Sequence, residues 1–268
     1  MDMSVAFKNE LESMSIESTD IDPNEEVTVP WGFAIISISI ALAILIAYRM
    51  YMNTYAFTVG LDYFDPEFQV YWMRLMWAQL IIIGGAGAVL VPWLWFTREK
   101  GEYELEPKVE LKRYYTMFAL LSLVSVVAFA ALAMFGEADA AWHQVTIRDT
   151  DFTPTHIGLF YFAFPLMWLG LGLGFIWVHT RLPDFQNRIS VPLALLAAGP
   201  FLIGPNVGFN EWGHAFFYAE ELFGSPVHYG FFVLGFGFFA LGGFLVQCYK
   251  RISLLTRLEG DDVESEAA

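Results

Sequence analysis

Long runs without charged residues dominate the pattern of polar and hydrophobic positions in this chain. Six stretches of at least 22 residues contain no Asp, Glu, Lys or Arg: residues 27–48, 75–97, 114–136, 152–180, 189–210 and 222–249. A bilayer-spanning α-helix needs roughly 20 apolar residues, whereas the strands of a membrane barrel are shorter and alternate in polarity. The pattern therefore predicts an all-α, polytopic membrane protein, a bundle of about six transmembrane helices.

Polar residues in front of several runs have the order expected at the start of a helix. Thr153-Pro154-Thr155-His156 and Ser225-Pro226-Val227-His228 each supply an N-cap hydroxyl, a proline at the first helical position and a His in the first turn. Asp65-Pro66-Glu67 has a similar order with an acidic first turn. We expect helices to begin at these three points.

The fifth run contains several residues that disfavour helix, and these predict a broken fifth helix: Pro192, Pro200, Gly204, Pro205 and Gly208. Irregular backbone at membrane depth is tolerated where it is buried in protein or lines a cavity, so a wall of a site is expected here. A second group of glycines predicts close packing between helices: Gly170, Gly172, Gly174, Gly235, Gly237, Gly242 and Gly243.

Composition agrees with a membrane protein, since 56% of the residues are hydrophobic and 16% are charged. The net charge of -15 arises largely at the ends, because 13 of the 29 acidic residues lie in residues 1–29 and 259–268. We interpret these ends as solvated tails, with a docking role for residues 5–16 as the alternative, and nucleic-acid binding has no support. The expected organisation is an acidic segment 1–26, a transmembrane helical domain 27–250 and an acidic tail 251–268.

The positive charges predict the orientation of the bundle. With six spans, the two termini and the second and fourth loops share one side and hold 11 of the 14 Lys and Arg residues. The other side holds Arg49, Arg74 and Arg148. Because cytoplasmic loops are enriched in Lys and Arg, both termini are expected in the cytoplasm. The third and fifth loops then lie on the outer side.

Two similar patterns of potential metal ligands border these outer loops. Asp139 and His143 are four residues apart and His156 follows 13 residues later; Asn210, His214 and His228 repeat the pattern with a final spacing of 14. Residues four apart share a helix face, so each pair can hold one ion that the later His completes. Nitrogen and oxygen donors suit copper, zinc or iron, and copper(II) binds most tightly in the general affinity order.

A structural interpretation competes with the metal hypothesis, because a single Asp and His four apart commonly form only a hydrogen bond. His179, which belongs to neither pattern, is expected to have such a structural role. The repetition favours metal binding, since polar groups at membrane depth are costly. Three further alternatives are an intramembrane proton or ion carrier, a haem protein with His156 and His228 as axial ligands, and a purely structural membrane protein of a larger complex.

Three segments carry a resemblance to a known family: Trp142-His143-Gln144 with residues 148–156, then Thr180-Arg181-Leu182-Pro183, then residues 204–216. These segments are similar to the C subunit of the particulate methane and ammonia monooxygenases, which are copper membrane monooxygenases. The resemblance extends to Asp65-Pro66-Glu67-Phe68 and Lys112-Arg113-Tyr114 and covers about residues 55–250.

The resemblance implies a copper enzyme of a bacterial cytoplasmic or intracytoplasmic membrane, assembled with the A and B subunits as a trimer of heterotrimers. It implies hydroxylation of a small substrate (methane, a short-chain alkane or alkene, or ammonia) with dioxygen, with quinol as electron donor and Asp139 or Glu211 handling protons. All six positions of the family's two ligand sets are filled, and they are the expected metal-binding and catalytic residues: Asp139, His143, His156, Asn210, His214 and His228. Residues 157–164 depart from the methane and ammonia branches.

Overall fold

The computed structural model describes residues 26–100, 103–145, 152–212 and 235–257, with the backbone alone described for residues 143, 144 and 202–212. Within these ranges the ordered elements are helices, and no strand occurs. The elements in chain order are α2 Trp31–Tyr55, α3 Pro66–Phe68, η1 Gln69–Met73, α4 Arg74–Phe96, α5 Pro107–Val145, α6 Pro154–Gly158, η2 Leu159–Ala163, α7 Phe164–Arg181, α8 Pro183–Gln186 and α9 Val191–Trp212. A last helical segment covers Gly235–Arg257.

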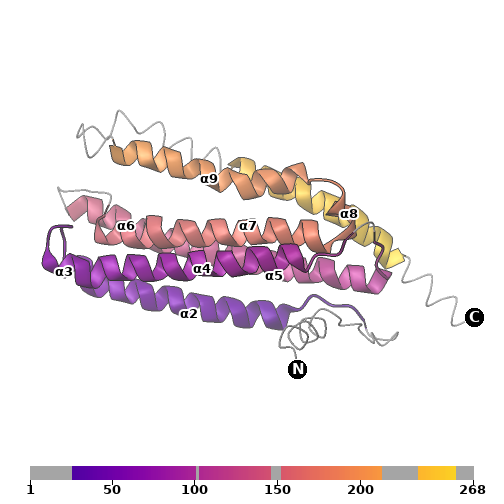
Figure 1. Cartoon of the computed structure of the whole chain (residues 1–268), viewed down its shortest axis with the longest axis horizontal. Coiled ribbons are helices and arrows are strands. Elements are labelled where there is room, and N and C mark those ends of the chain that lie inside the picture. The colour runs from indigo at the N-terminus through magenta and orange to yellow at the C-terminus, as the bar shows by residue number, and fades with distance from the viewer. Residues whose placement is uncertain (1–25, 101–102, 146–151, 213–234, 258–268) are drawn as a thin grey trace, which may run out of the picture.

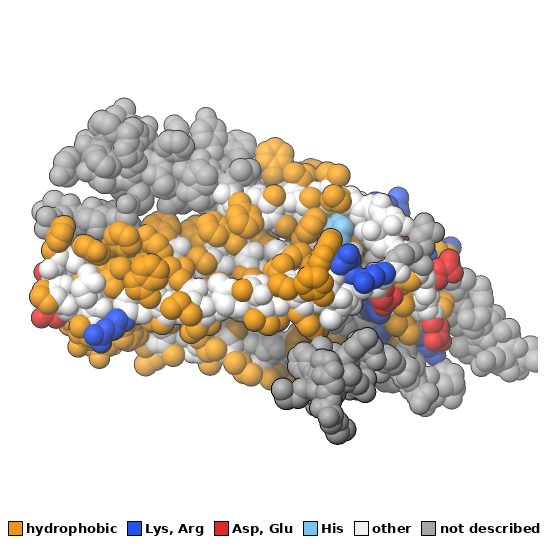
Figure 2. Space-filling model, viewed as in Figure 1, with side chains coloured by type: hydrophobic (Ala, Val, Ile, Leu, Met, Phe, Trp, Pro, Cys, Tyr) orange, Lys and Arg blue, Asp and Glu red, His pale blue; other side chains and the backbone are white. Residues whose placement is uncertain are grey.

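The helices have the length and composition of membrane spans. Five of the described helical segments qualify: Trp31–Tyr55, Pro66–Phe96, Pro107–Trp142, Pro154–Arg181 and Gly235–Arg257. In Figure 2, hydrophobic side chains cover the middle of the visible face, while charged side chains gather toward the two ends. The prediction of an all-α, multi-pass membrane bundle is therefore confirmed.

The spans lie lengthwise beside one another and alternate in direction (Figure 1). Helix α2 packs on α5, α4 packs on α7, and α7 also contacts α5 and α9. We call the end that holds α3, α6 and the last turns of α5 the α6 end, and the opposite end, where α8 lies, the α8 end. The Thr-Pro and Asp-Pro helix starts both lie at the α6 end.

Each end of the bundle has its own buried core. At the α6 end, the fully buried Phe68, Trp72 and Phe135 pack between α2, η1 and α5. At the α8 end, Tyr114, Phe185 and Phe244 pack α5 and α8 against the last helix. The apolar outer faces of the spans suit contact with lipid, whose acyl chains are as apolar as these side chains.

The predicted break in the fifth helix is not present, because α9 runs as one helix from Val191 to Trp212 through Pro200 and Pro205. A proline removes one backbone hydrogen bond, but its φ is compatible with a helix. In a bilayer, interrupting the helix would leave more backbone groups without partners than a single proline does. The helical backbone therefore persists.

The glycines on which close packing was predicted behave in two ways. A Cβ added at Gly170 would lie 3.3 Å from Val124, and one at Gly243 would lie 3.3 Å from Pro192, so these two are packing positions. Among the described residues, an added Cβ would meet nothing within 4 Å at the other five, so close packing is not found there: Gly172, Gly174, Gly235, Gly237 and Gly242.

Candidate metal centre at the α6 end

Helix α6 begins as its sequence predicts, and this start places His156. Thr153 is the N-cap, with φ −70° and ψ 155°, and Pro154 occupies the first helical position. The Thr153 hydroxyl accepts a hydrogen bond from the His156 backbone N–H at 3.4 Å. The cap therefore fixes the first turn of α6 and directs the imidazole of His156 into the bundle, where the residue is fully buried.

The His156 imidazole meets a carboxylate from α5. Nε2 of His156 lies 3.3 Å from Oδ1 of Asp139. Asp139 is 8% exposed, so a carboxylate and an imidazole share a nearly water-free position among membrane helices. Ionisable groups in such surroundings are rare in membrane proteins and are usually functional. The two residues come from the first predicted ligand set.

A small residue allows α6 to approach α2 and α5 beside this pair. A Cβ added at Gly158 would lie 2.9 Å from Sδ of Met52 and 2.9 Å from Cδ1 of Phe135. Real Cβ atoms essentially never make contacts this short, so the side chain of Met52 or Phe135 would have to shift. The ring of Phe160 packs on the His156 imidazole with centroids 4.7 Å apart. The contact with Phe160 thus helps to hold the imidazole in place.

A buried amide ties the turn after His156 to two other spans. Gln79 of α4 is 6% exposed, and its Nε2 donates to the backbone oxygen of Ile157 at 2.7 Å. The Gln79 Oε1 accepts from the hydroxyl of Tyr48 on α2 at 2.9 Å. The Tyr48 ring packs against Phe135 of α5, with centroids 4.9 Å apart. The chain Tyr48–Gln79–Ile157 therefore joins α2 and α4 to the segment that carries His156.

The hydrogen-bonding pattern changes directly after this turn. Residues Leu159–Ala163 form the π-helical segment η2, and Gln69–Met73 form η1 at the corresponding position of the second span. A π-helical turn shifts the register of the residues that follow and is often found at functional sites. Because α6 contacts η1, both irregular turns lie together at the α6 end.

The structure brings together two of the six predicted ligands, Asp139 and His156. The side chains of the other four lie outside the described residues. The backbones of His143 and Asn210 lie in α5 and α9, but their side chains are outside the described residues, as are His214 and His228 altogether. In Figure 1, α9 ends toward the end of the bundle at which α6 begins. Among the described residues, no group of three or more His, Cys, Asp and Glu side chains forms a metal cluster.

Sequence reasoning missed three contributors to this centre: Tyr48, Gln79 and Gly158. Gln79 had a signal, because an amide in the middle of an uncharged span needs a partner. Gly158 and Tyr48 had none, since an apolar stretch contains many residues of both types. Their roles depend on which helices become neighbours.

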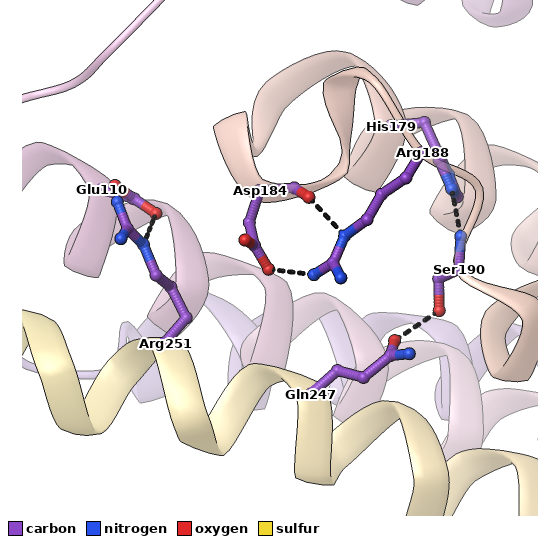
Figure 3. A network of polar contacts seen from close by, with 7 residues as sticks. All are labelled: Glu110, His179, Asp184, Arg188, Ser190, Gln247 and Arg251. Carbon is purple, nitrogen blue, oxygen red and sulfur yellow. Dashed lines mark hydrogen bonds and ion pairs between the residues drawn. The ribbon is translucent and has the colours of Figure 1, made fainter.

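A second polar network lies at the α8 end and has a structural role (Figure 3). The backbone N–H of Ser190 donates to Nε2 of His179 at 3.2 Å, so Nδ1 carries the proton and donates to the Phe175 oxygen at 2.8 Å. The Ser190 hydroxyl donates to Gln247 of the last helix at 2.7 Å. The Nδ1 bond lies within α7, and the Nε2 bond holds α7 to the start of α9, which confirms the structural role predicted for His179.

The last helix is also held at this end by ion pairing. Nε and Nη2 of Arg251 each donate to the fully buried Glu110 of α5 at 2.7 Å. Asp184 and Arg188 form a further pair within the segment around α8. Of the charged residues in Figure 3, Glu110 and Arg251 therefore join two helices, and Asp184 and Arg188 pair locally.

The fold and this centre define a multi-pass helical membrane protein with a buried carboxylate–imidazole pair at one end. The sequence profile of a family described as the C subunit of ammonia monooxygenase/methane monooxygenase matches residues 17–259. The chain belongs to this family and is one component of a membrane monooxygenase built from several different chains. Comparison with individual curated protein sequences gives no match.

Proposed function

We propose that this chain is the C subunit of a copper-dependent membrane monooxygenase and that it binds copper at the α6 end through Asp139, His143 and His156. The substrate is a small molecule, namely methane, a short-chain alkane or alkene, or ammonia, and it is hydroxylated with dioxygen. The second set, Asn210, His214 and His228, supplies a further metal position near the end of α9. The family membership supports the reaction class.

The observation that carries the copper proposal is the buried pair of Asp139 and His156. Nitrogen and oxygen donors about 2.0–2.2 Å from one ion and at a tetrahedral angle lie about 3.3–3.6 Å from each other. Nε2 and Oδ1 are 3.3 Å apart, so the two donors can contact one ion without a change in backbone position. His143 follows Asp139 by one helical turn and can add a third donor. The donor set therefore fits copper.

The residues around the pair have separate tasks. Asp139 and His156 hold the ion, while Phe160, which packs on the imidazole, helps to keep water away from it. Bound copper supplies the electron transfer to dioxygen that these side chains cannot perform. Hydroxylation with dioxygen consumes two protons as well as two electrons, and Asp139 or Glu211 handles these protons.

The proposal extends to the surroundings of the chain. The partners are the A and B subunits in a trimer of heterotrimers, with quinol as the electron donor, in a bacterial cytoplasmic or intracytoplasmic membrane. The clustering of Lys and Arg toward the α8 end supports a cytoplasmic position for that end and for both acidic tails, 1–26 and 251–268.

The copper proposal is tested by comparing His156→Ala with His179→Ala in purified complexes that contain equal amounts of this chain. Both residues lie in the fourth span, but His179 has the structural hydrogen bonds described above. We expect His156→Ala to lose copper from this chain and to lose oxygen-dependent product, while His179→Ala keeps its copper. Equal copper content in the two variants, or zinc in place of copper in the unaltered complex, would contradict the proposal.

A further inference from the structure

A cavity of about 320 Å³ lies among α4, α5, α7, α9 and the last helix. All its lining residues are apolar or glycine, and they include Leu90, Trp93, Val124, Gly174 and Leu196. Its volume falls at the lower end of the range of ligand-binding pockets. Val124 is the lining residue of α5 nearest to Asp139 in the sequence, and the two residues are 15 positions apart, which corresponds to about 22 Å of helix. The cavity is therefore separate from the proposed copper centre.

The cavity reaches the surface of the described bundle beside α4. Leu90 and Trp93 line the cavity and are also 38% and 47% exposed. In a bilayer, the medium at such a surface is acyl chain. Water has no polar partner in an apolar cavity, and an empty cavity leaves its walls without dispersion contacts. An acyl chain is therefore the occupant that these walls favour.

A guanidinium group lies at the rim of the same cavity. Arg181, the last residue of α7, lies over the ring of Trp93 at 5.9 Å, and its Nη1 is 3.5 Å from the backbone oxygen of Leu94. Its Nη2 donates to the hydroxyl of Thr97 at 2.5 Å. Arg98 directly follows Thr97, and its guanidinium carbon lies 3.9 Å from the centroid of the Trp95 ring. Tryptophan and arginine together mark the level of lipid headgroups.

We propose that this cavity binds one acyl chain of an anionic phospholipid, whose phosphate is held by Arg181 with help from Arg98. A guanidinium carries five N–H groups and binds phosphate in a forked geometry. Arg181 contacts three acceptors among the described residues, so it has donors to offer a phosphate. The apolar walls and the cation at the rim match the two parts of one amphipathic molecule. This inference does not depend on the copper proposal.

Two glycines of α7 provide a matched pair of variants. An added Cβ meets nothing within 4 Å at either Gly174 or Gly172, yet Gly174 lines the cavity and Gly172 does not. Gly174→Leu places a side chain where the acyl chain would lie, whereas Gly172→Leu adds the same volume on another face. Phospholipid that remains on the purified complex after extensive detergent washing is measured by native mass spectrometry. We expect Gly174→Leu to lose a phospholipid that Gly172→Leu retains.

A second measurement does not depend on how the variants assemble. The unaltered complex is exchanged into phosphatidylglycerol with brominated acyl chains, and bromine is located in a density map. We expect bromine density inside the cavity, and weaker density when the lipid is brominated phosphatidylcholine. Equal lipid retention by the two glycine variants, bromine confined to the outer surface, or a quinone or a partner's side chain in the cavity would overturn the proposal.

Discussion

Replacing Gln79 with Leu tests whether the buried amide positions His156. The substitution removes the hydrogen bond to the Ile157 oxygen at 2.7 Å and the one from Tyr48 at 2.9 Å. Hydrogen bonds between membrane helices contribute about 0.6 kcal/mol on average and up to about 1.7 kcal/mol. Loss of the two bonds therefore weakens this region by about 1.2–3.4 kcal/mol.

This free energy converts into an expected change in copper affinity. If the turn that carries His156 relaxes when the amide is lost, the binding of copper must restore its position. A factor of ten in affinity corresponds to about 1.4 kcal/mol, so copper binding should weaken by roughly 7-fold to 300-fold. Residues that support metal ligands typically contribute about 10–100-fold, which lies within this range. Tyr48→Phe removes one of the two bonds and should have a smaller effect.

The assay is copper titration of the purified complex against a chelator, with the Cu(II) electron paramagnetic resonance spectrum as a second readout. The matched control is Gln247→Leu, which removes an interhelical hydrogen bond of 2.7 Å to Ser190 at the α8 end. The control should lower thermal stability and leave copper affinity and the spectrum unchanged. The positioning role of Gln79 is wrong if both variants change copper binding equally, or if neither changes it.

Two other predictions follow from the packing and the charge distribution. Gly158→Ala should lower the thermal midpoint of the complex and its copper content, because overpacking typically costs about 1–3 kcal/mol. Gly136→Ala should lower neither, since its added Cβ meets nothing within 4 Å of the described residues. Equal effects of the two variants would contradict this prediction. In intact cells, a membrane-impermeant thiol reagent should label Glu137→Cys at the α6 end but not Lys100→Cys at the α8 end, with the buried Cys248 giving no background. The reverse labelling would invert the proposed orientation.

The sequence was sufficient for the spans and for the helix starts at Asp65-Pro66 and Thr153-Pro154, because both depend on local chemistry. Uncharged runs must be helical in a bilayer, and Thr153-Pro154 limits where the fourth span can begin. The break predicted in α9 was wrong for the same physical reason, since the bilayer favours continuing the helix through Pro200 and Pro205. A prediction based only on the helix preference of each residue therefore overestimated how far proline interrupts a helix in the membrane.

The buried Asp139 and His156 could be singled out from the sequence, but the residues that position them could not. Asp139 and His156 stood out because ionisable residues are rare in these spans, and the structure places them 3.3 Å apart. The contact of Gln79 with Ile157 joins residues 78 positions apart and depends on how α4 meets α6. No periodicity encodes such a contact. The glycines of α7 likewise needed the arrangement of helices to separate Gly174, which lines the cavity, from Gly172, which does not.

The most direct test of copper binding at the α6 end is a structure of the intact complex with copper located by its anomalous scattering. We predict a copper peak at bonding distance from both Nε2 of His156 and Oδ1 of Asp139, with the signal lost below the copper absorption edge. Copper found elsewhere in the complex, while these two side chains contact only each other, would contradict the assignment of the metal centre.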